Sequence, residues 1–229
     1  MKYVSIDIET TGLDPENDQV LSIGAIIEDT NNSLFYEEIP KFHGVIKRNS
    51  IKGGLYAINL NRELLGTLNH YMTAKDQDEK NDIVQMTGMK FYDEDEIVQE
   101  FYYWLASNGI VDLSKAIGHG YVTTSSGKTL IPAITRSTEA VHINVAGKNF
   151  GTFDKLFLER LPRWKQLIKV RQRIIDPSVL YVDWSNDESL PSMSECKVRA
   201  GLDGHVSHNA LEDAWDVVKL IRVSKQKGI

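Results

Sequence analysis

The chain has 229 residues, of which 41% are hydrophobic and 25% charged, which is the composition of a globular protein able to bury a core. No apolar run approaches the roughly 18 residues that a membrane span requires. We therefore do not expect this chain to be an integral membrane protein or to have a membrane partner. The net charge of −6 argues against attraction of the whole surface to nucleic acid. The single Cys196 cannot form an internal disulfide, and Met1-Lys2-Tyr3 leaves no room for a signal peptide, so we expect a cytoplasmic protein.

The chain begins with a predicted strand at residues 3–9, in which apolar and polar residues alternate. One face carries Val4, Ile6 and Ile8, and the other carries Ser5, Asp7 and Glu9. Gly12, Asp14 and Pro15 end this strand.

Two more strands are expected close behind the first. The mostly apolar run 20–28 predicts the second, 29–33 a turn and 34–39 the third, which together favour an antiparallel meander. A further short strand pair is expected at 42–47, before the break at Gly53-Gly54.

The second half of the chain mixes helices with short strands. Helical spacing of apolar residues predicts helices at 93–106, 152–161 and 209–225. Strands are expected at 141–145 and 173–176, and 117–134 is a hairpin or a mobile loop. We therefore predict one α/β domain spanning 1–229, with an insertion near 111–136. The roles of the 40–90 and 111–136 segments stay open.

Asp7 and Glu9 are the first candidate site residues. Side chains two apart on a strand point the same way, about 7 Å apart, and these would lie near its carboxyl end. Asp14-Pro15-Glu16 has the same spacing, so the pattern alone equally fits two carboxylates on a solvated strand face.

The second candidate is Asp154, in the run Lys148-Asn149-Phe150-Gly151-Thr152-Phe153-Asp154. This run follows a predicted strand and opens a predicted helix. An acid in the first turn of a helix is often only compensation of the helix dipole, so the run alone is not specific.

The third candidate is the run His208-Asn209-Ala210-Leu211-Glu212-Asp213-Ala214. Asn209 and Glu212 have the spacing of a helix cap. A cap does not explain Asp213, which shares a helix face with Val217 and so should point inward. A buried carboxylate requires a cation or hydrogen-bond donors.

Together, these three runs resemble the motifs of the DEDD exonuclease superfamily, in its His-containing (DEDDh) subgroup. The matching patterns, in order, are Asp7-Ile8-Glu9-Thr10-Thr11-Gly12, the N-x-x-x-F-D of 149–154 and the H-x-A-x-x-D-A of 208–214. Relatives include the proofreading epsilon subunit of bacterial replicative polymerase, RNase T and oligoribonuclease. The resemblance spans Tyr3 to about Arg222 and implies an RNase H-like mixed sheet with flanking helices. The gap between the first two motifs is longer than in the minimal family domain, and Lys148 stands where some relatives carry His.

The resemblance implies two-metal-ion catalysis with Mg²⁺ or Mn²⁺, which prefer oxygen ligands. Asp7 would bridge both ions, Glu9 and Asp213 would complete one site, and Asp154 would hold the second ion largely through water. His208 would be the general base, because its ordinary pKa of roughly 6.5 lets it accept a proton near neutrality.

The resemblance also implies contacts with the end of a single strand. Glu9 and the backbone N–H groups of Thr10 and Thr11, beside Gly12, would hold the terminal 3′-OH. Leu13 would wedge against the last bases, and Phe150 or Phe153, near Asn149, would stack on one. For Phe153 a core position is favoured, as it is for Tyr56 and Trp215; Asp176 fits either the border of the pocket or a simple turn.

The predicted function is therefore a 3′→5′ exonuclease that releases nucleoside 5′-monophosphates from single-stranded nucleic acid, with DNA slightly favoured over RNA. The alternative is an inactive nucleic-acid-binding or polymerase accessory module. An RNase H-type endonuclease gives no reason for a histidine five residues before the last aspartate. The resemblance also allows a homodimer or a polymerase partner.

One stretch is strongly basic. Residues 148–173 contain eight lysines and arginines against Asp154 and Glu159. A solvated helix face explains such a stretch as well as a nucleic-acid contact does.

Overall fold

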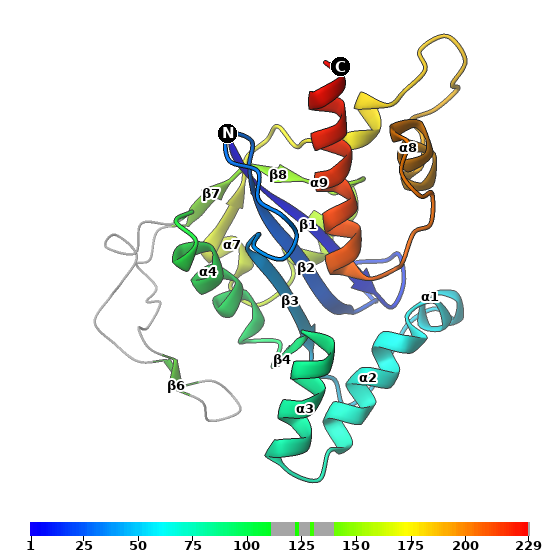
Figure 1. Cartoon of the computed structure of the whole chain (residues 1–229). Coiled ribbons are helices and arrows are strands. Elements are labelled where there is room, and N and C mark those ends of the chain that lie inside the picture. Colours follow the sequence, from blue (N-terminus) through cyan, green and yellow to red (C-terminus); the bar gives the residue numbers. More distant parts are fainter. Residues whose placement is uncertain (111–121, 124–128, 131–139, 229) are drawn as a thin grey trace.

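The computed structural model describes residues 1–110, 122–123, 129–130 and 140–228. At its centre is a mixed five-stranded sheet in the order β4-β3-β2-β1-β8 (Figure 1). The strands are β1 (Lys2–Thr10), β2 (Val20–Asp29), β3 (Lys41–Ile46), β4 (Lys90–Tyr92) and β8 (Val145–Ala146). The pairs β1–β2 and β2–β3 are antiparallel, whereas β1–β8 and β3–β4 are parallel. The predicted α/β fold with a mixed sheet and flanking helices is confirmed.

Two short strand pairs lie outside this sheet. The parallel pair is β7 (Val141–Ile143) with β9 (Ile168–Val170), and the antiparallel pair is β5 (Val122–Thr123) with β6 (Thr129–Leu130). The helices are α1 (Leu55–Leu60), α2 (Arg62–Thr73), α3 (Gln77–Thr87), α4 (Ile97–Ser107), α6 (Asp154–Leu158), α7 (Trp164–Leu167), α8 (Met193–Ala200) and α9 (Ala210–Lys227), with a 3-10 helix, η1 (Pro177–Leu180). Among the described residues, no helix is long and apolar enough to cross a membrane.

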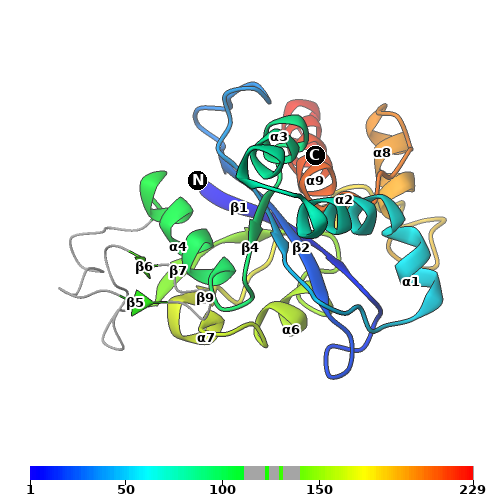
Figure 2. The ribbon, with the colours of Figure 1, turned by 90° about the horizontal axis from the view of Figure 1, so that it is seen from below.

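The helices form a layer on each face of the sheet. Helix α9 lies on one face, together with α2 and α3, and α8 packs beside α9 (Figures 1 and 2). Helices α4, α6 and α7 lie on the opposite face. The site residues come from β1, α6 and α9, so both layers contribute to it.

Strand β1 alternates between the two layers, as predicted. Val4, Ile6 and Ile8 are buried in the core on the α4 and α7 side. On the other face, Ser5 Oγ donates to the Ala214 carbonyl of α9 at 2.8 Å. Asp7, two residues further along, therefore faces α9 as well.

The strand predicted at 34–39 is wrong, and so is the short pair predicted at 42–47. Residues 34–39 turn, with the Ile39 N–H donating to the Phe35 carbonyl at 2.9 Å. Tyr36 packs on Trp215 of α9, with the ring centroids 5.1 Å apart, so the apolar alternation there covers a helix instead of building a sheet. The third strand is the single strand β3, which pairs on both edges.

Several later boundaries also differ from the predictions. The expected helix at 152–161 is regular only over α6. The Leu161 N–H donates to the Leu158 carbonyl, which forms a turn instead of a further turn of α-helix, and Pro162 follows. The strand predicted at 173–176 is reduced to one bridge, between Ala146 and Ile175, and the strand that pairs here is β9. The predicted strand 141–145 is split into β7 and β8. Most of the 111–136 segment lies outside the described residues.

Helices α1 to α3 and α8 were not predicted from the sequence. Tyr56, expected in the core, is 81% exposed because α1 buries none of its residues. Trp215 and Phe153 are partly buried against core clusters, as expected.

Gly24 of β2 determines how closely α9 approaches the sheet. It lies opposite Asp7 in the β1–β2 register, and a Cβ at this position would lie 2.1 Å from the backbone carbonyl carbon of Ala210. Backbone cannot move aside cheaply, so only glycine allows the first turn of α9 to rest on β2 beside Asp7.

We predict that Gly24→Ala destabilises the fold by at least about 1–3 kcal/mol, the usual cost of overpacking. The same change should weaken stabilisation by divalent metal, because it pushes the start of α9 away from β1. Thermal melts with and without Mn²⁺ measure both effects. Gly66→Ala is the matched control, because Gly66 lies inside α2 and a Cβ there would meet no atom within 4 Å, so alanine should stabilise by roughly 0.5–1 kcal/mol. Equal melts for Gly24→Ala and wild type would contradict the role of Gly24.

Candidate active site

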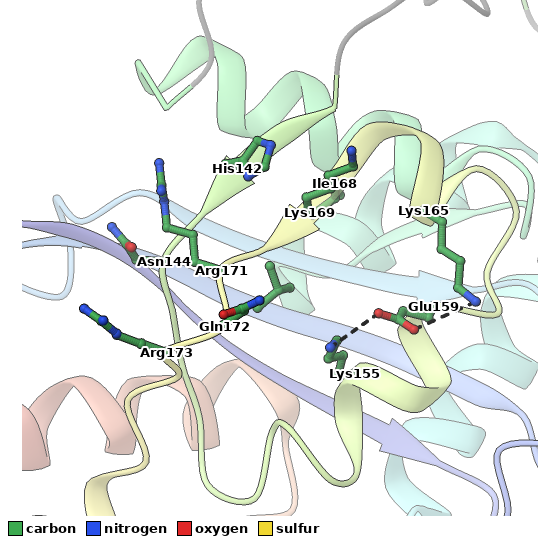
Figure 3. A pocket seen from close by; sticks show the side chains of 11 residues that line it. His142, Asn144, Lys155, Glu159, Lys165, Ile168, Lys169, Arg171, Gln172 and Arg173 are labelled. Carbon is green, nitrogen blue, oxygen red and sulfur yellow. Dashed lines mark ion pairs between the residues drawn. The ribbon is translucent and has the colours of Figure 1, made fainter.

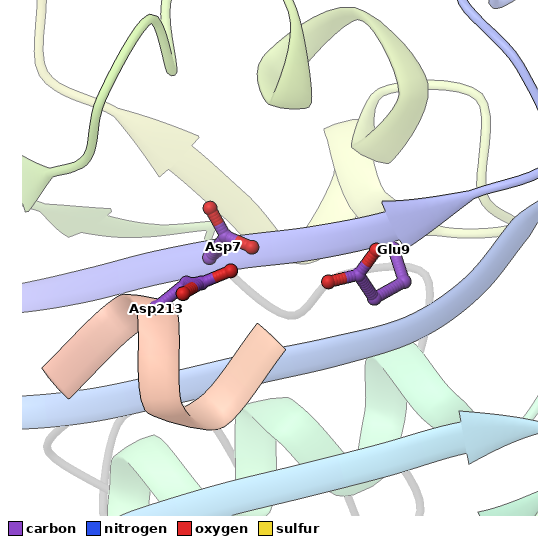
Figure 4. Close-up of side chains that lie close together, drawn as sticks. All are labelled: Asp7, Glu9 and Asp213. Carbon is purple, nitrogen blue, oxygen red and sulfur yellow. The ribbon is translucent and has the colours of Figure 1, made fainter. Parts of the chain in front are cut away.

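Three carboxylates from two elements meet above β1. Asp7 and Glu9 extend from β1, and Asp213 comes from the first turn of α9 (Figure 4). Each offers an oxygen, and these oxygens all lie within 4.8 Å of one another. Glu9 and Asp213 are buried and Asp7 is half-buried. The structure therefore brings together side chains that are more than 200 residues apart in the chain.

The start of α9 is built to present Asp213. The Asn209 side chain caps the helix by accepting from the N–H groups of Leu211 and Glu212. The predicted cap residue is thus confirmed, and it places Asp213 in the first turn. Ser207 Oγ donates to Asp213 Oδ1 at 3.3 Å, which orients the carboxylate.

Asp154 approaches from the opposite layer. It is the first residue of α6, it is buried, and its Oδ1 accepts from the Ile8 N–H at 3.1 Å. This N–H is available because β8 pairs with β1 only at Val4 and Ser5. Asp154 is outside the group of three oxygens, but it is fixed to the strand segment between Asp7 and Glu9.

Burial raises the pKa values of all four carboxylates, and the charges of other carboxylates add to this at Asp7, Glu9 and Asp213. Burial, then the charges of Asp154, Asp213 and Glu9, raise the pKa of Asp7 well above its ordinary value. Burial and Asp213 raise the pKa of Glu9 to about 8, against a hydrogen bond from Asn61 that lowers it. Burial raises the pKa of Asp154 to about 7, although backbone hydrogen bonds lower it. Burial and then Asp216 raise the pKa of Asp213.

Such a cluster fits a hard divalent cation. Its donors are carboxylate oxygens, which Mg²⁺ and Mn²⁺ prefer over nitrogen or sulfur. Buried like charges this close are unfavourable without a counterion, and a divalent ion removes the repulsion. Asp7, Glu9 and Asp213 are placed to hold one ion, with Asp154 beside them.

His208 lies on the rim of the cluster. It is exposed, in the loop before α9, with a φ of 53° that non-glycine residues adopt only rarely. It follows Ser207, whose Oγ donates to Asp213 Oδ1 at 3.3 Å, so the backbone places His208 next to this carboxylate. The predicted base is therefore beside the carboxylates, on the side open to solvent.

A buried ion pair that the sequence analysis missed holds the His208 loop. The ammonium group of Lys197, on α8, donates to the His205 carbonyl and to the Asp216 carboxylate. Lys197 and Asp216 are both buried. An acid next to Val217 on the inward face of α9 could have signalled a buried cationic partner.

Asn61 and Gly53 support the segment after Glu9 and were also missed. Asn61 is buried, and its Nδ2 donates to the carbonyls of Thr10 and Ala57, each at 3.1 Å. A Cβ on Gly53 would lie 2.2 Å from the Thr11 carbonyl oxygen, and the Gly54 N–H donates to that oxygen at 2.8 Å. The Gly53-Gly54 break is therefore a close backbone contact under the site.

The predicted 3′-OH donors differ in availability. Thr10 and Thr11 are buried beside Glu9, but the Thr11 N–H already donates to the Gln19 carbonyl at 2.9 Å. Thr11 is therefore not a free donor, which corrects the expectation for this residue. Gly12 packs against the Asp18 side chain, and Leu13 is 83% exposed, as a wedge against bases requires.

The loop before α6 also differs from expectation. Phe150 is fully buried in the core, so its predicted stacking on a base is wrong in this arrangement. Asn149 is exposed with a φ of 56°, and its N–H donates to Asp176 Oδ2 at 2.9 Å. Asp176 Oδ1 also accepts from the N–H and Oγ of Ser178. Asp176 is thus a turn residue that also fixes this loop.

Comparison with known proteins agrees with the first motif and with the fold. Residues 4–53 match the RNase_T family model, described as Exonuclease. No curated protein sequence matches the chain significantly.

Several solved structures with a similar fold each cover 99% of this chain, and the following three are among them. Exonuclease I of E. coli, in complex with a 5cy-dT13 oligonucleotide, is 12% identical with a TM-score of 0.52, and Exonuclease I of Methylocaldum szegediense is 14% identical with a TM-score of 0.53. This chain spans only 41% and 40% of those chains. A 3′-exonuclease described for 3′-end-specific recognition of histone mRNA stem-loop is 11% identical, with a TM-score of 0.53 and 82% of that chain covered. At these identities the likeness shows the fold alone.

The raised pKa values predict how stability depends on pH without metal. A carboxyl whose folded pKa is raised destabilises the fold above its unfolded pKa, and this is relieved as pH falls through the folded pKa. For Glu9 and Asp154 the window runs from about 4 to about 8. In EDTA the melting temperature should therefore fall as the pH is raised from 5 to 9.

Asp154→Asn should reduce that fall and raise the melting temperature in EDTA at pH 8, because Asn Oδ1 can still accept from Ile8. It should also shrink the shift produced by Mg²⁺ or Mn²⁺. Asp187→Asn is the control, because Asp187 pairs with Arg199 and this hydrogen bond lowers its pKa, so loss of its charge should not stabilise the fold. A lower melting temperature in EDTA for Asp154→Asn would contradict the cluster.

Proposed function

We propose that this chain, which carries the first motif and the fold of the DEDD exonuclease superfamily, is a metal-dependent 3′→5′ exonuclease acting on single-stranded nucleic acid. The observation that carries the proposal is the convergence of Asp7, Glu9 and Asp213 within 4.8 Å, with Asp154 and His208 beside them. Membership of the His-containing subgroup, and one domain across 1–229, are part of the proposal.

The carboxylates and the histidine would have different roles, in metal binding and in proton transfer. Two divalent ions bound here would activate water and stabilise the leaving oxygen during phosphodiester hydrolysis. Asp7, Glu9, Asp154 and Asp213 are the residues that would hold them. His208, on the open side of the cluster, would take the proton from the attacking water. The products would be nucleoside 5′-monophosphates.

The closed floor of the site favours a strand end over the middle of a strand. Beyond Glu9, the path of a nucleic-acid strand is blocked by Thr10 and Thr11. Both residues are buried, and they contact Asn61 and Gly53. A strand entering past Leu13 would therefore stop with its terminal sugar at Glu9. We propose that Glu9 accepts a hydrogen bond from the terminal 3′-OH, which makes the enzyme specific for that end.

An inactive binding or accessory module remains the second candidate. It would be marked by loss of a metal ligand, whereas all four carboxylates and the histidine are present. We predict that single-stranded DNA is favoured over RNA as the substrate. A homodimer or a polymerase partner, and a cytoplasmic location, are also predictions.

We predict that a 3′-phosphate blocks digestion, whereas a 5′-phosphate does not. A terminal phosphate dianion would replace the 3′-OH beside Glu9, with buried residues behind it and no room to move further. The measurement is a product ladder from 5′-labelled DNA and RNA strands in Mg²⁺ and in Mn²⁺, with 3′-labelled strands to identify the first product. Circular single strands cut as fast as linear ones would overturn the exonuclease proposal.

His208→Ala should lower kcat by roughly 10²–10⁴, the usual contribution of a general base. Its effect on the metal-induced rise in melting temperature should be small, because His208 lies outside the group of carboxylate oxygens. His205→Ala is the matched control from the same loop: its side chain is exposed, and Lys197 binds only its backbone carbonyl. Loss of the metal-induced shift in His208→Ala, with kcat restored by excess Mn²⁺, would make His208 a ligand instead of a base.

A further inference from the structure

A large hollow lies beside α6, on the side of β7 and β9. Its volume is about 900 Å³, and five of the eleven residues that line it are lysines or arginines (Figure 3). We call it the basic hollow and define it by Lys155, Lys165, Lys169, Arg171 and Arg173. The one carboxylate in its lining is Glu159, so the basic hollow carries an excess of four positive charges in a chain whose net charge is −6.

Three of the cations lie within five residues of one another, in the segment that begins with β9 and continues along β7 and β8. Lys169 lies in β9, and pairing continues past it, since the Arg171 N–H donates to the Ile143 carbonyl and the Ile175 N–H to the Val145 carbonyl, each at 2.9 Å. Lys169, Arg171 and Arg173 are exposed, and all three line the basic hollow. The pairing register shifts by two residues between Ile143–Val170 and Ala146–Ile175, so these side chains do not follow a regular strand alternation. Three neighbouring cations suit a ligand that carries several negative charges.

The basic hollow and the carboxylates share two parts of the chain. Asp154 points to β1, whereas Lys155, the next residue, lines the basic hollow. The segment that begins with β9 ends at Asp176, which binds the backbone N–H of Asn149 in the loop that leads to Asp154. A strand whose end is at the carboxylates would therefore meet these cations as it passes α6.

Three of the five cations form no ion pair with another described residue, and the other two share one carboxylate. Glu159 pairs with both Lys155 and Lys165, at 3.7 and 3.9 Å. Within the part of the chain that the structure describes, Lys169, Arg171 and Arg173 have no acidic partner. Solvated cations without partners are available to neutralise phosphates, and such contacts release counterions.

We propose that the basic hollow binds the phosphate backbone of a single nucleic-acid strand upstream of its 3′ end. The inference rests on the proposed function for the direction of the strand. The basic stretch 148–173 is therefore split: Lys155, Lys165, Lys169, Arg171 and Arg173 face the ligand, whereas Arg160 pairs with Glu16 and Arg163 donates to Gln99, outside the basic hollow.

The test measures the binding of labelled DNA and RNA strands of 2 and 20 nucleotides to two double variants by fluorescence anisotropy. EDTA is present to prevent cleavage. Lys169→Gln with Arg171→Gln should lower the slope of log K against log salt by about 1.4, or about 0.7 for each phosphate contact on a single strand. It should also remove most of the gain in affinity from the shorter to the longer strand. The control is Lys75→Gln with Lys90→Gln, two exposed cations outside the basic hollow, which should change neither quantity.

Glu159→Gln provides a change in the opposite direction. Removing this carboxylate frees Lys155 and Lys165, so the variant should bind the 20-residue strand more tightly and with a steeper salt dependence. Unchanged slopes in both basic-hollow variants, or equal losses in the Lys75/Lys90 control, would overturn the proposal. That result would also leave an acidic protein as the better candidate for this surface.

Hydrolysis of the p-nitrophenyl ester of thymidine 5′-monophosphate separates this inference from the proposed function. The small ester reaches the carboxylates without a strand to lie in the basic hollow. The Lys169/Arg171 variant should hydrolyse it at the wild-type rate, and a parallel loss on ester and long strand would contradict a binding role. If wild type hydrolyses nothing but the anisotropy effects appear, the proposed function fails and the basic hollow stands.

Discussion

The site depends on the close contact between Gly24 and the first turn of α9. Because β2 carries no side chain at this position, the helix backbone rests directly on the sheet, opposite Asp7. That contact brings Asp213 to the two carboxylates of β1. On the other face, the short length of β8 leaves the Ile8 N–H free to bind Asp154. One missing side chain and one short strand thus place four acids around a single strand.

This arrangement opposes stability when no cation is present, and the surrounding residues limit the cost. Burial raises the pKa values of the four acids, and nearby carboxylates add to this at Asp7, Glu9 and Asp213, so part of their charge is lost near neutral pH. Hydrogen-bond donors oppose this effect at three of them: Asn61 at Glu9, the backbone N–H groups of Asp154 and Ile8 at Asp154, and Ser207 at Asp213. These donors fix the carboxylates in place but do not neutralise them, which is what a site for a divalent cation requires.

Sequence reasoning succeeded where a signal was local and failed where the partner was distant. The alternation in β1 and the helix face that Asp213 shares with Val217 both depend on neighbouring residues, and they predicted which way Asp7 and Asp213 point. The run at 34–39 alternates equally well, but Tyr36 packs on Trp215, and nothing local distinguishes that contact from a strand. Phe150 lies inside the second motif, yet its ring is buried in the hydrophobic core. The contact at Gly24 joins segments far apart in the chain, and the position of Asp216 on α9 signals a buried cation without identifying Lys197, so spacing alone could not reveal either contact.

The most direct test is the number of Mn²⁺ ions that the protein binds, measured by isothermal titration or by the loss of the free-ion resonance signal. Asp7 lies at the centre of the four acids, so Asp7→Asn should remove measurable binding at concentrations that saturate the wild type. Glu16→Gln, which removes an exposed acid after β1 that pairs with Arg160, should leave binding unchanged. Our account predicts two ions for the wild type and none for Asp7→Asn. Binding that is absent in the wild type, or the same in wild type and Asp7→Asn, would contradict it.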